Sequence, residues 1–345
     1  MKGVHLGIGI AAGVAAGALC VGVLAAVGDE EPAPPPTSPT TTAAQDTGPG
    51  AAPIASAPYL HLGWGRPPQP HKVMDATGIT AFTLAFALSG GGCAPAFDGK
   101  RPLRGGPEAE TAQAIKDAGG QVHVSFGGWS GRKLGPRCAT PEAYAGAVQK
   151  VIDALAPTAL DFDIENDDEL GNAAVQDRIL KALKIIKADN PDIALIITTS
   201  TDKKGLDKWG QRLLERAAAL DAPVDNYTVM PFNFGGSSDM YADTVAAAEN
   251  LKDRLMAVHG WDAATAYRMT GVSGMNGVSD DGEITTPQTW TRLRDWASAR
   301  GLGRLSFWSV NRDRPCPSGG DPVTDCSGTE QHPWEFGKIT AGFRQ

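Results

Sequence analysis

One segment constrains this chain more than any other, because residues 160–166 read LDFDIEN and place an acid at every second position. A period of two is the period of a β-strand, so the bulky apolar side chains share one face and Asp161, Asp163 and Glu165 share the other. Successive carboxylates then lie about 6.6 Å apart along the strand, and like charges this close raise one another's pKa. A strand with only a structural role has no reason to carry that cost. The segment is therefore a candidate catalytic site in which a tuned carboxyl acts as a general acid.

Two other interpretations of these acids remain open. The segment could be an edge strand with a solvated acidic face, or a divalent-cation site, since hard cations bind clustered carboxylates. However, the six histidines are scattered, and no spacing of Cys and His is typical of a metal site. We expect neither a metal nor a cofactor.

Strand-like and helix-like segments alternate along the chain after residue 58. Strands are expected at residues 59–64, 79–88, 121–126, 160–166, 193–199, 227–232, 267–272 and 305–310. Helices are expected at residues 108–118, 140–155, 173–188, 207–220, 243–259 and 287–300. This alternation predicts an α/β fold with a parallel sheet, and eight repeats in one domain of this size predict a closed (β/α)8 TIM barrel. A doubly wound open sheet is disfavoured because no Gly-rich phosphate loop follows the first strand.

The first 58 residues are not expected to be part of the barrel. Residues 1–28 hold Lys2 and then a long charge-free stretch, which is typical of a secretory signal peptide or of a signal anchor that would tether the protein to a membrane. Residues 29–58 are rich in Pro, Thr and Ala and predict a disordered spacer. We therefore expect an exported protein, extracellular or at the cell surface, with residues 59–345 as its single catalytic domain.

Cysteine usage and charge add two further expectations. Four cysteines lie within the expected domain, and an even number in an exported chain suggests disulfides. Cys316 and Cys326 bracket a short loop and form the first expected pair, which leaves Cys93 with Cys138, although sequence alone does not exclude other pairings. The net charge of −8 argues against a nucleic-acid partner. We expect a monomer.

The acidic segment resembles a signature of a known family, the family 18 glycoside hydrolases, which include chitinases. Their fourth strand carries D-x-x-D-x-D-x-E, and Asp161, Asp163 and Glu165 match its last three acids, whereas Thr158 replaces the first. The third-strand signature S-x-G-G is matched from Ser125 to residue 128. The eighth strand, SFWSVNRD at residues 306–313, looks like that of bacterial members. The resemblance covers the chain from residue 59 to its C-terminus.

The resemblance implies a role for each acid in a substrate-assisted retaining reaction, in which the N-acetyl carbonyl of the sugar attacks the anomeric carbon. Glu165 would protonate the leaving oxygen. Asp163 would orient and stabilise the N-acetyl group, and Asp161 would modulate Asp163 from below. Ser125 would support the acids rather than react.

The resemblance also suggests residues that bind the sugar. Trp308 would stack under it at the central subsite. Trp64 and Trp129 lie in Gly-flanked turns and are candidate sugar platforms, with simple loop packing as the alternative.

The sixth strand departs from the family pattern. The family usually has a Tyr and an Asp or Asn there, but residues 230–235 read MPFNFG, with a Phe where the hydroxyl is expected. Met230, Phe232 and Asn233 are expected wall contacts, although ordinary barrel filling explains Met230 as well.

These features predict an exported hydrolase of β-1,4-linked N-acetylglucosamine polymers, a chitinase whose partner is a polysaccharide or oligosaccharide substrate. An endo-β-N-acetylglucosaminidase acting on glycans or cell-wall chains is the enzyme alternative. A non-catalytic chitin- or glycan-binding barrel is the alternative from another class. Such binding proteins usually lose the acid, and Glu165 is present, but Thr158 and the missing Tyr leave this alternative open.

Overall fold

The computed structural model describes residues 54–345, and the expected signal segment at residues 1–28 lies outside this range. Most of the expected spacer lies outside it as well. Among the residues described, no helix combines the length and the apolar character needed to cross a membrane.

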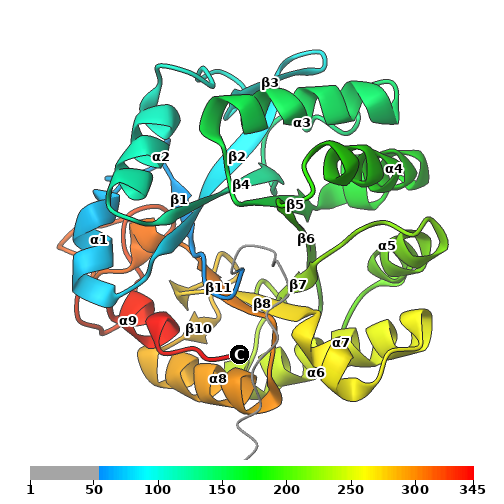
Figure 1. Ribbon diagram of the computed structural model, residues 1–345. Helices are drawn as coiled ribbons and strands as arrows, with labels where there is room; N and C mark the ends of the chain where they lie inside the picture. Colours follow the sequence, from blue (N-terminus) through cyan, green and yellow to red (C-terminus); the bar gives the residue numbers. More distant parts are fainter. Residues whose placement is uncertain (1–53) are drawn as a thin grey trace, which may run out of the picture. The chain divides into compact units, whose positions relative to one another are not determined.

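Eight parallel strands follow one another around the sheet in chain order (Figure 1). They are β1 (Tyr59–His61), β2 (Ala81–Gly91), β4 (Gln121–Gly127), β5 (Ala159–Ile164), β6 (Ala194–Ser200), β7 (Asn226–Met230), β8 (Thr270–Met275) and β11 (Arg304–Trp308). The segment before β1 closes the ring, because the amide of Leu305 donates to the carbonyl of Ala55 at 2.8 Å and the hydroxyl of Ser306 donates to that of Ala57 at 2.9 Å. The fold is the expected (β/α)8 barrel, and it begins a few residues before residue 59.

Helices surround the strands in Figure 1. They are α1 (Pro70–Thr77), α2 (Pro107–Asp117), α3 (Pro141–Leu155), α4 (Ala173–Asp189), α5 (Lys208–Ala219), α6 (Met240–His259), α7 (Ala263–Arg268), α8 (Pro287–Arg300) and α9 (Glu335–Ala341). Three short strands, β3 (Ala94–Phe97), β9 (Gly277–Val278) and β10 (Ile284–Thr285), add hairpins to the barrel. A π-helix, η1 (Asn166–Leu170), follows β5, and a 3-10 helix, η2 (Val310–Arg312), follows β11.

The seventh strand was predicted three residues too early. Asp262 caps α7 by accepting a hydrogen bond from the amide of Thr265 at 2.7 Å, so Tyr267 and Arg268 complete a helix. The strand therefore spans Thr270–Met275. Helices α1 and α9 were not anticipated at all.

The apolar face of β5 packs against the helices, as its period of two predicts. Phe162 stacks on Phe126 of β4 with ring centroids 5.5 Å apart and lies 6.4 Å from the ring of Tyr144 in α3. Burying side chains of this size stabilises the fold by roughly 1.5–3 kcal/mol each. The opposite face of β5 must then point into the barrel.

Both expected disulfides are present. Cys93 is bonded to Cys138, and Cys316 is bonded to Cys326. The first joins the turn between β2 and β3 to the segment before α3, and the second closes a loop after β11.

Candidate active site

Asp161 lies inside the barrel and is held by three strands. Its Oδ2 accepts hydrogen bonds from the hydroxyls of Tyr59 and Ser125, both at 2.7 Å, and its Oδ1 accepts one from Thr198 at 2.6 Å. The donors come from β1, β4 and β6. Three hydroxyl donors suit a carboxylate, which can only accept. Ser125 therefore contacts one of the acids, and its supporting role stays a prediction, whereas the contacts of Tyr59 and Thr198 were not predicted from the sequence.

Asp163 lies two residues further along β5, toward the end of the strand, and its backbone is packed tightly against β4. A side chain at Gly127 would place its Cβ 2.1 Å from the Asp163 carbonyl, and Gly127 also has a φ of +103°, so only glycine fits. The side chain of Asp163 is buried, and its Oδ1 has no hydrogen-bond partner within residues 54–345. Burial raises its pKa well above the usual value, and Glu165 and Asp161 add to the rise.

Glu165 is the outermost acid, because it follows the last residue of β5. Its exposed fraction is 8%, so the carboxyl is largely removed from water. Burial is the main cause that raises its pKa to about 7, Lys133 opposes the rise and Asp161 adds to it. A carboxyl with such a pKa holds a proton near neutral pH and can donate it.

Two buried charged residues near this acid were missed from the sequence. Lys133 is 1% exposed, and its Nζ donates to the carbonyl of Ser130 at 2.8 Å. Glu169 lies in η1 and accepts a hydrogen bond from the amide of Gly135 at 3.1 Å, and burial raises its pKa to about 8. Three further acids occupy residues 167–169 in the sequence, but only packing shows that Glu169 is buried.

An aromatic cluster lies where β1 and β11 end, and it includes Phe86 from the middle of β2. Trp308 stacks nearly parallel on Phe86, with centroids 5.4 Å apart, and meets Trp64 edge to face at 5.5 Å. Trp64 is 36% exposed. Asn311 holds the turn that bears Trp64, because its Nδ2 donates to the carbonyls of His61 and Trp64 at 2.8 and 3.2 Å. The structure thus brings Trp308 and Trp64 together.

Trp129 stands apart from this cluster, on the loop that follows β4. Trp129 is 71% exposed, and its backbone carbonyl accepts a hydrogen bond from the side-chain amide of Asn166. The loop is thereby tied to the residue after Glu165. A sugar-binding role for Trp129 stays a prediction.

The three residues predicted to line the wall after β7 differ in their burial and in their partners. Met230 is buried at the end of the strand and Phe232 is half-buried. The Asn233 side chain is already bonded to Asp280, donating to its carboxylate at 3.1 Å and accepting from its amide at 3.1 Å. The side-chain amide of Asn233 therefore ties its loop to the turn at Asp280, and sugar contacts by Met230, Phe232 and Asn233 stay predictions.

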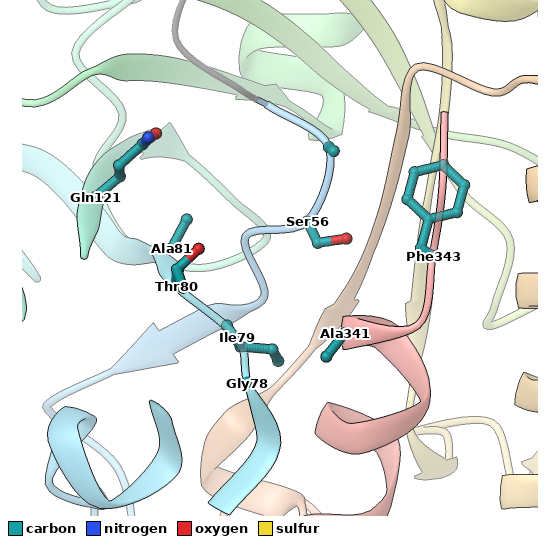
Figure 2. Close-up of a pocket in the computed structure, with 9 residues that line it drawn as sticks. Ser56, Gly78, Ile79, Thr80, Ala81, Gln121, Ala341 and Phe343 are labelled. Carbon is teal, nitrogen blue, oxygen red and sulfur yellow. The ribbon is translucent and has the colours of Figure 1, made fainter. Parts of the chain in front are cut away.

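A small hollow lies at the other end of the barrel, where the strands begin. It has a volume of about 160 Å³ and is lined by residues such as Ser56, Thr80, Gln121 and Phe343 (Figure 2). None of its lining side chains is an acid or a base, so it offers no proton-transfer chemistry. Within residues 54–345, no group of three or more His, Cys, Asp and Glu side chains could hold a metal ion.

Two curated proteins are similar to this chain over most of its length. The probable bifunctional chitinase/lysozyme of Escherichia coli (strain K12) is 27% identical over 305 residues, which cover 83% of this chain and 34% of that protein. Endochitinase 11 of Metarhizium anisopliae is 26% identical over 277 residues, which cover 75% of this chain and 52% of that protein. The chain therefore spans only part of the length of these relatives.

A solved structure matches more completely. The catalytic domain of the hyperthermophilic chitinase from Pyrococcus furiosus is 30% identical, and the match covers 86% of this chain and 100% of that one with a TM-score of 0.76. No protein-family model matches the chain. The similarity to the archaeal domain extends over the entire barrel of that protein.

Proposed function

The chain belongs to the family 18 glycoside hydrolases, and we propose that it cleaves β-1,4-linked N-acetylglucosamine polymers such as chitin. Relatives named chitinase, endochitinase and chitinase/lysozyme support this class of substrate. Two acids on β5 and the one that follows it would supply the chemistry.

The observation that carries the proposal is the state of Glu165. It stands at the mouth-side end of a row of inward-facing acids, is nearly buried, and has a pKa raised to about 7 mainly by burial. These properties suit a general acid that must hold a proton at neutral pH and release it to a leaving group.

The proposed reaction proceeds in two steps. Glu165 gives its proton to the bridging oxygen while the N-acetyl carbonyl oxygen of the same sugar bonds to the anomeric carbon, and the glycosidic bond breaks. This forms an oxazolinium ion. The carboxylate of Glu165 then takes a proton from water, and the water oxygen opens the ring at the anomeric carbon. Two inversions at one carbon retain its configuration.

The two inner acids serve the N-acetyl group in this proposal. The raised pKa of Asp163 favours its protonated form, so its carboxyl can donate a hydrogen bond to the N-acetyl group and orient it. Asp161 keeps its three hydroxyl donors and supplies a fixed negative charge below Asp163. That charge would stabilise the positive oxazolinium.

The sugar would rest on the aromatic cluster. Trp308 is the proposed floor of the central subsite, and Trp64 and Trp129 are proposed platforms to either side of it. The absent Tyr hydroxyl after β7 removes one hydrogen bond to the developing charge, which is worth about 1.5–3 kcal/mol. This loss would slow the reaction but not abolish it.

We also propose that the protein acts outside the cytoplasm. Two disulfides support this, because such bonds persist in oxidising compartments. The apolar N-terminal stretch of the sequence points the same way.

Release of a chromophore from an N-acetylchitobioside tests the proposed activity. We expect Glu165→Gln to lower kcat by about 10²–10⁴-fold while chito-oligosaccharide binding is retained, because only the proton donor is lost. Glu215→Gln, the same change at an exposed position on α5, should leave kcat unchanged.

Other outcomes identify the alternatives. If the unaltered protein and Glu165→Gln bind chito-oligosaccharides equally and neither cleaves them, the barrel is a lectin. Cleavage of an N-glycoprotein but not of chito-oligosaccharides would instead identify an endo-β-N-acetylglucosaminidase.

A further inference from the structure

Glu283, between β9 and β10, is bound by the backbone of a distant loop. Its Oε1 accepts hydrogen bonds from the amides of Phe234 at 2.6 Å and Gly236 at 2.9 Å, and its Oε2 accepts one from the amide of Asn233 at 3.0 Å. The side chain is 3% exposed. A buried carboxylate with three backbone donors from residues 233–236 is the main support of that loop.

The loop has a backbone conformation that needs such support. Asn233, Gly235 and Gly236 all have positive φ angles, of 56°, 72° and 108°. This conformation turns successive N–H groups toward one point and forms a nest that binds an anion. In this protein the anion is a side chain of the same chain, so the loop depends on it for its shape.

Glu283 is itself fixed by its neighbours. The hydroxyl of Ser279 donates to its Oε2 and also accepts from its backbone amide at 3.2 Å. These bonds, together with those from the loop, outweigh burial and lower the pKa of Glu283, so it stays charged. The exposed acids Asp280 and Asp281 of the same turn bind the side chain of Asn233 and the amide of Gly235.

Arg312 links the hairpin of β9 and β10 to Trp308. Arg312 donates to the carbonyl of Val278 in β9 and, at 3.3 Å, to the carbonyl of Trp308. The guanidinium therefore joins the hairpin that carries Glu283 to the proposed floor of the sugar site. The loop at residues 231–236 follows β7, so it lies at the same end of the barrel as Glu165, which follows β5.

We propose that Glu283 is a positioning residue that fixes the loop at residues 231–236 as a wall of the sugar-binding site. The inference rests on the proposed function, since the ligand is the same sugar chain. The wall carries Phe232 and Phe234, one of which stands where the family has its Tyr, so the placement of the wall relative to Trp308 determines how well the sugar is held. Glu283 does not touch the reacting atoms and acts through the loop.

Binding measured without turnover tests this role. In full-length protein carrying Glu165→Gln, we expect the added change Glu283→Gln to weaken binding of the N-acetylglucosamine hexamer by about tenfold. Tryptophan fluorescence measures this binding. The amide nitrogen of Gln would meet at least one N–H donor, so the nest loses an acceptor. With Glu165 intact, KM should rise by a similar factor and kcat should change by less than about twofold.

A second readout follows the loop directly. Cleavage after Phe232 or Phe234 by a protease specific for aromatic residues should be faster in Glu283→Gln than in the control Glu215→Gln. Glu283→Asp keeps both acceptor oxygens and should restore part of the affinity. Ser279→Ala, a milder change at the same contact, should shift KM in the same direction and keeps the test valid if Glu283→Gln fails to fold.

Unchanged hexamer affinity and unchanged protease resistance in Glu283→Gln would overturn the inference. An equal fall in kcat and kcat/KM, with KM unaltered, would overturn it as well, because the residue would then act on the transition state. If the unaltered protein binds the hexamer but does not cleave it, the proposed function fails, and the binding comparison still decides the role of Glu283.

Discussion

Burial and two nearby charges set the pH at which Glu165 can act. Its pKa is raised to about 7 mainly by burial, so the carboxyl is protonated below this pH and loses its proton above it. The general acid must be protonated when substrate binds. We therefore expect kcat/KM for chito-oligosaccharides to fall by about tenfold per pH unit above pH about 7, as measured in a series of buffers at constant ionic strength.

Lys133 should control the pH above which kcat/KM falls, which is the alkaline limb of the pH profile. Its positive charge favours the ionised form of Glu165 and works against the negative charge of Asp161, and it also acts on Asp163 and Glu169. Lys133→Met should therefore move the alkaline limb of kcat/KM to higher pH. An alkaline limb that moves to lower pH, or does not move, would contradict this assignment.

A matched control separates charge from general instability. Lys181 lies exposed on α4, and Lys181→Met removes the same charge at the surface. Its pH profile should match that of the unaltered protein, because solvent screens distant surface charges. The difference between the two variants isolates the effect of the buried lysine.

The strands of the barrel are cross-linked through Asp161. One of its three donors is Tyr59 of the first strand, β1. Tyr59 is as buried as Tyr227 of β7. Tyr59→Phe should lower the free energy of unfolding by about 1.5–3 kcal/mol, because a hydrogen bond to a carboxylate is lost inside the barrel. Denaturant unfolding monitored by circular dichroism measures the change.

Tyr227→Phe is the control for this prediction. The Tyr227 hydroxyl makes no side-chain hydrogen bond within the described part of the chain, so its removal should cost less. Equal losses of stability in the two variants would show that ring packing, and not the bond to Asp161, explains the effect.

The strands were predictable because their signals are local. The period of two in β5 acts within a few residues, and the structure confirms that strand. The helix expected at residues 140–155 is also confirmed, and Thr140 caps it by accepting a hydrogen bond from the amide of Ala143. The prediction failed at β8 because Tyr267 favours a strand by residue type, while the cap at Asp262 favours a helix. Local competition of this kind cannot be decided from residue types alone.

The candidate site was predictable only where short sequence motifs mark its residues. The inward-facing row of acids on β5 was predicted from its period of two, and Ser125 lies within hydrogen-bond distance of that row. The contact between Trp64 and Trp308 was not predicted. Lys133 and Glu283 could not be found, because each is one charged residue in a loop and its burial depends on segments far away in the sequence. Their partners meet only when the barrel closes.

The two disulfides brace different parts of the barrel mouth. Cys93–Cys138 holds the end of the loop after β4, which carries Trp129 and Lys133. The loop closed by the other disulfide contacts the turn of Trp64, since a Cβ at Gly65 would lie 2.7 Å from the Thr324 carbonyl. Each bridge therefore stabilises the backbone that presents one proposed sugar platform.

Removing the two bridges should cost different amounts of stability. The cysteines of the first bridge are 45 residues apart and those of the second are 10 apart. Loop-closure entropy alone then predicts losses of about 4 and about 2.7 kcal/mol in the free energy of unfolding, because the longer loop gains more freedom in the unfolded chain. Denaturant unfolding of the paired Cys→Ala variants under oxidising conditions measures both values.

Activity distinguishes the local from the global effect of each bridge. At a temperature where both double variants remain folded, loss of Cys93–Cys138 should change the pH profile, because the loop that holds Lys133 is loosened. Loss of Cys316–Cys326 should raise KM and leave the profile unchanged, because only the platform at Trp64 is affected. The same kinetic change in both variants would mean that the bridges stabilise the barrel as a unit and do not position separate parts of its mouth.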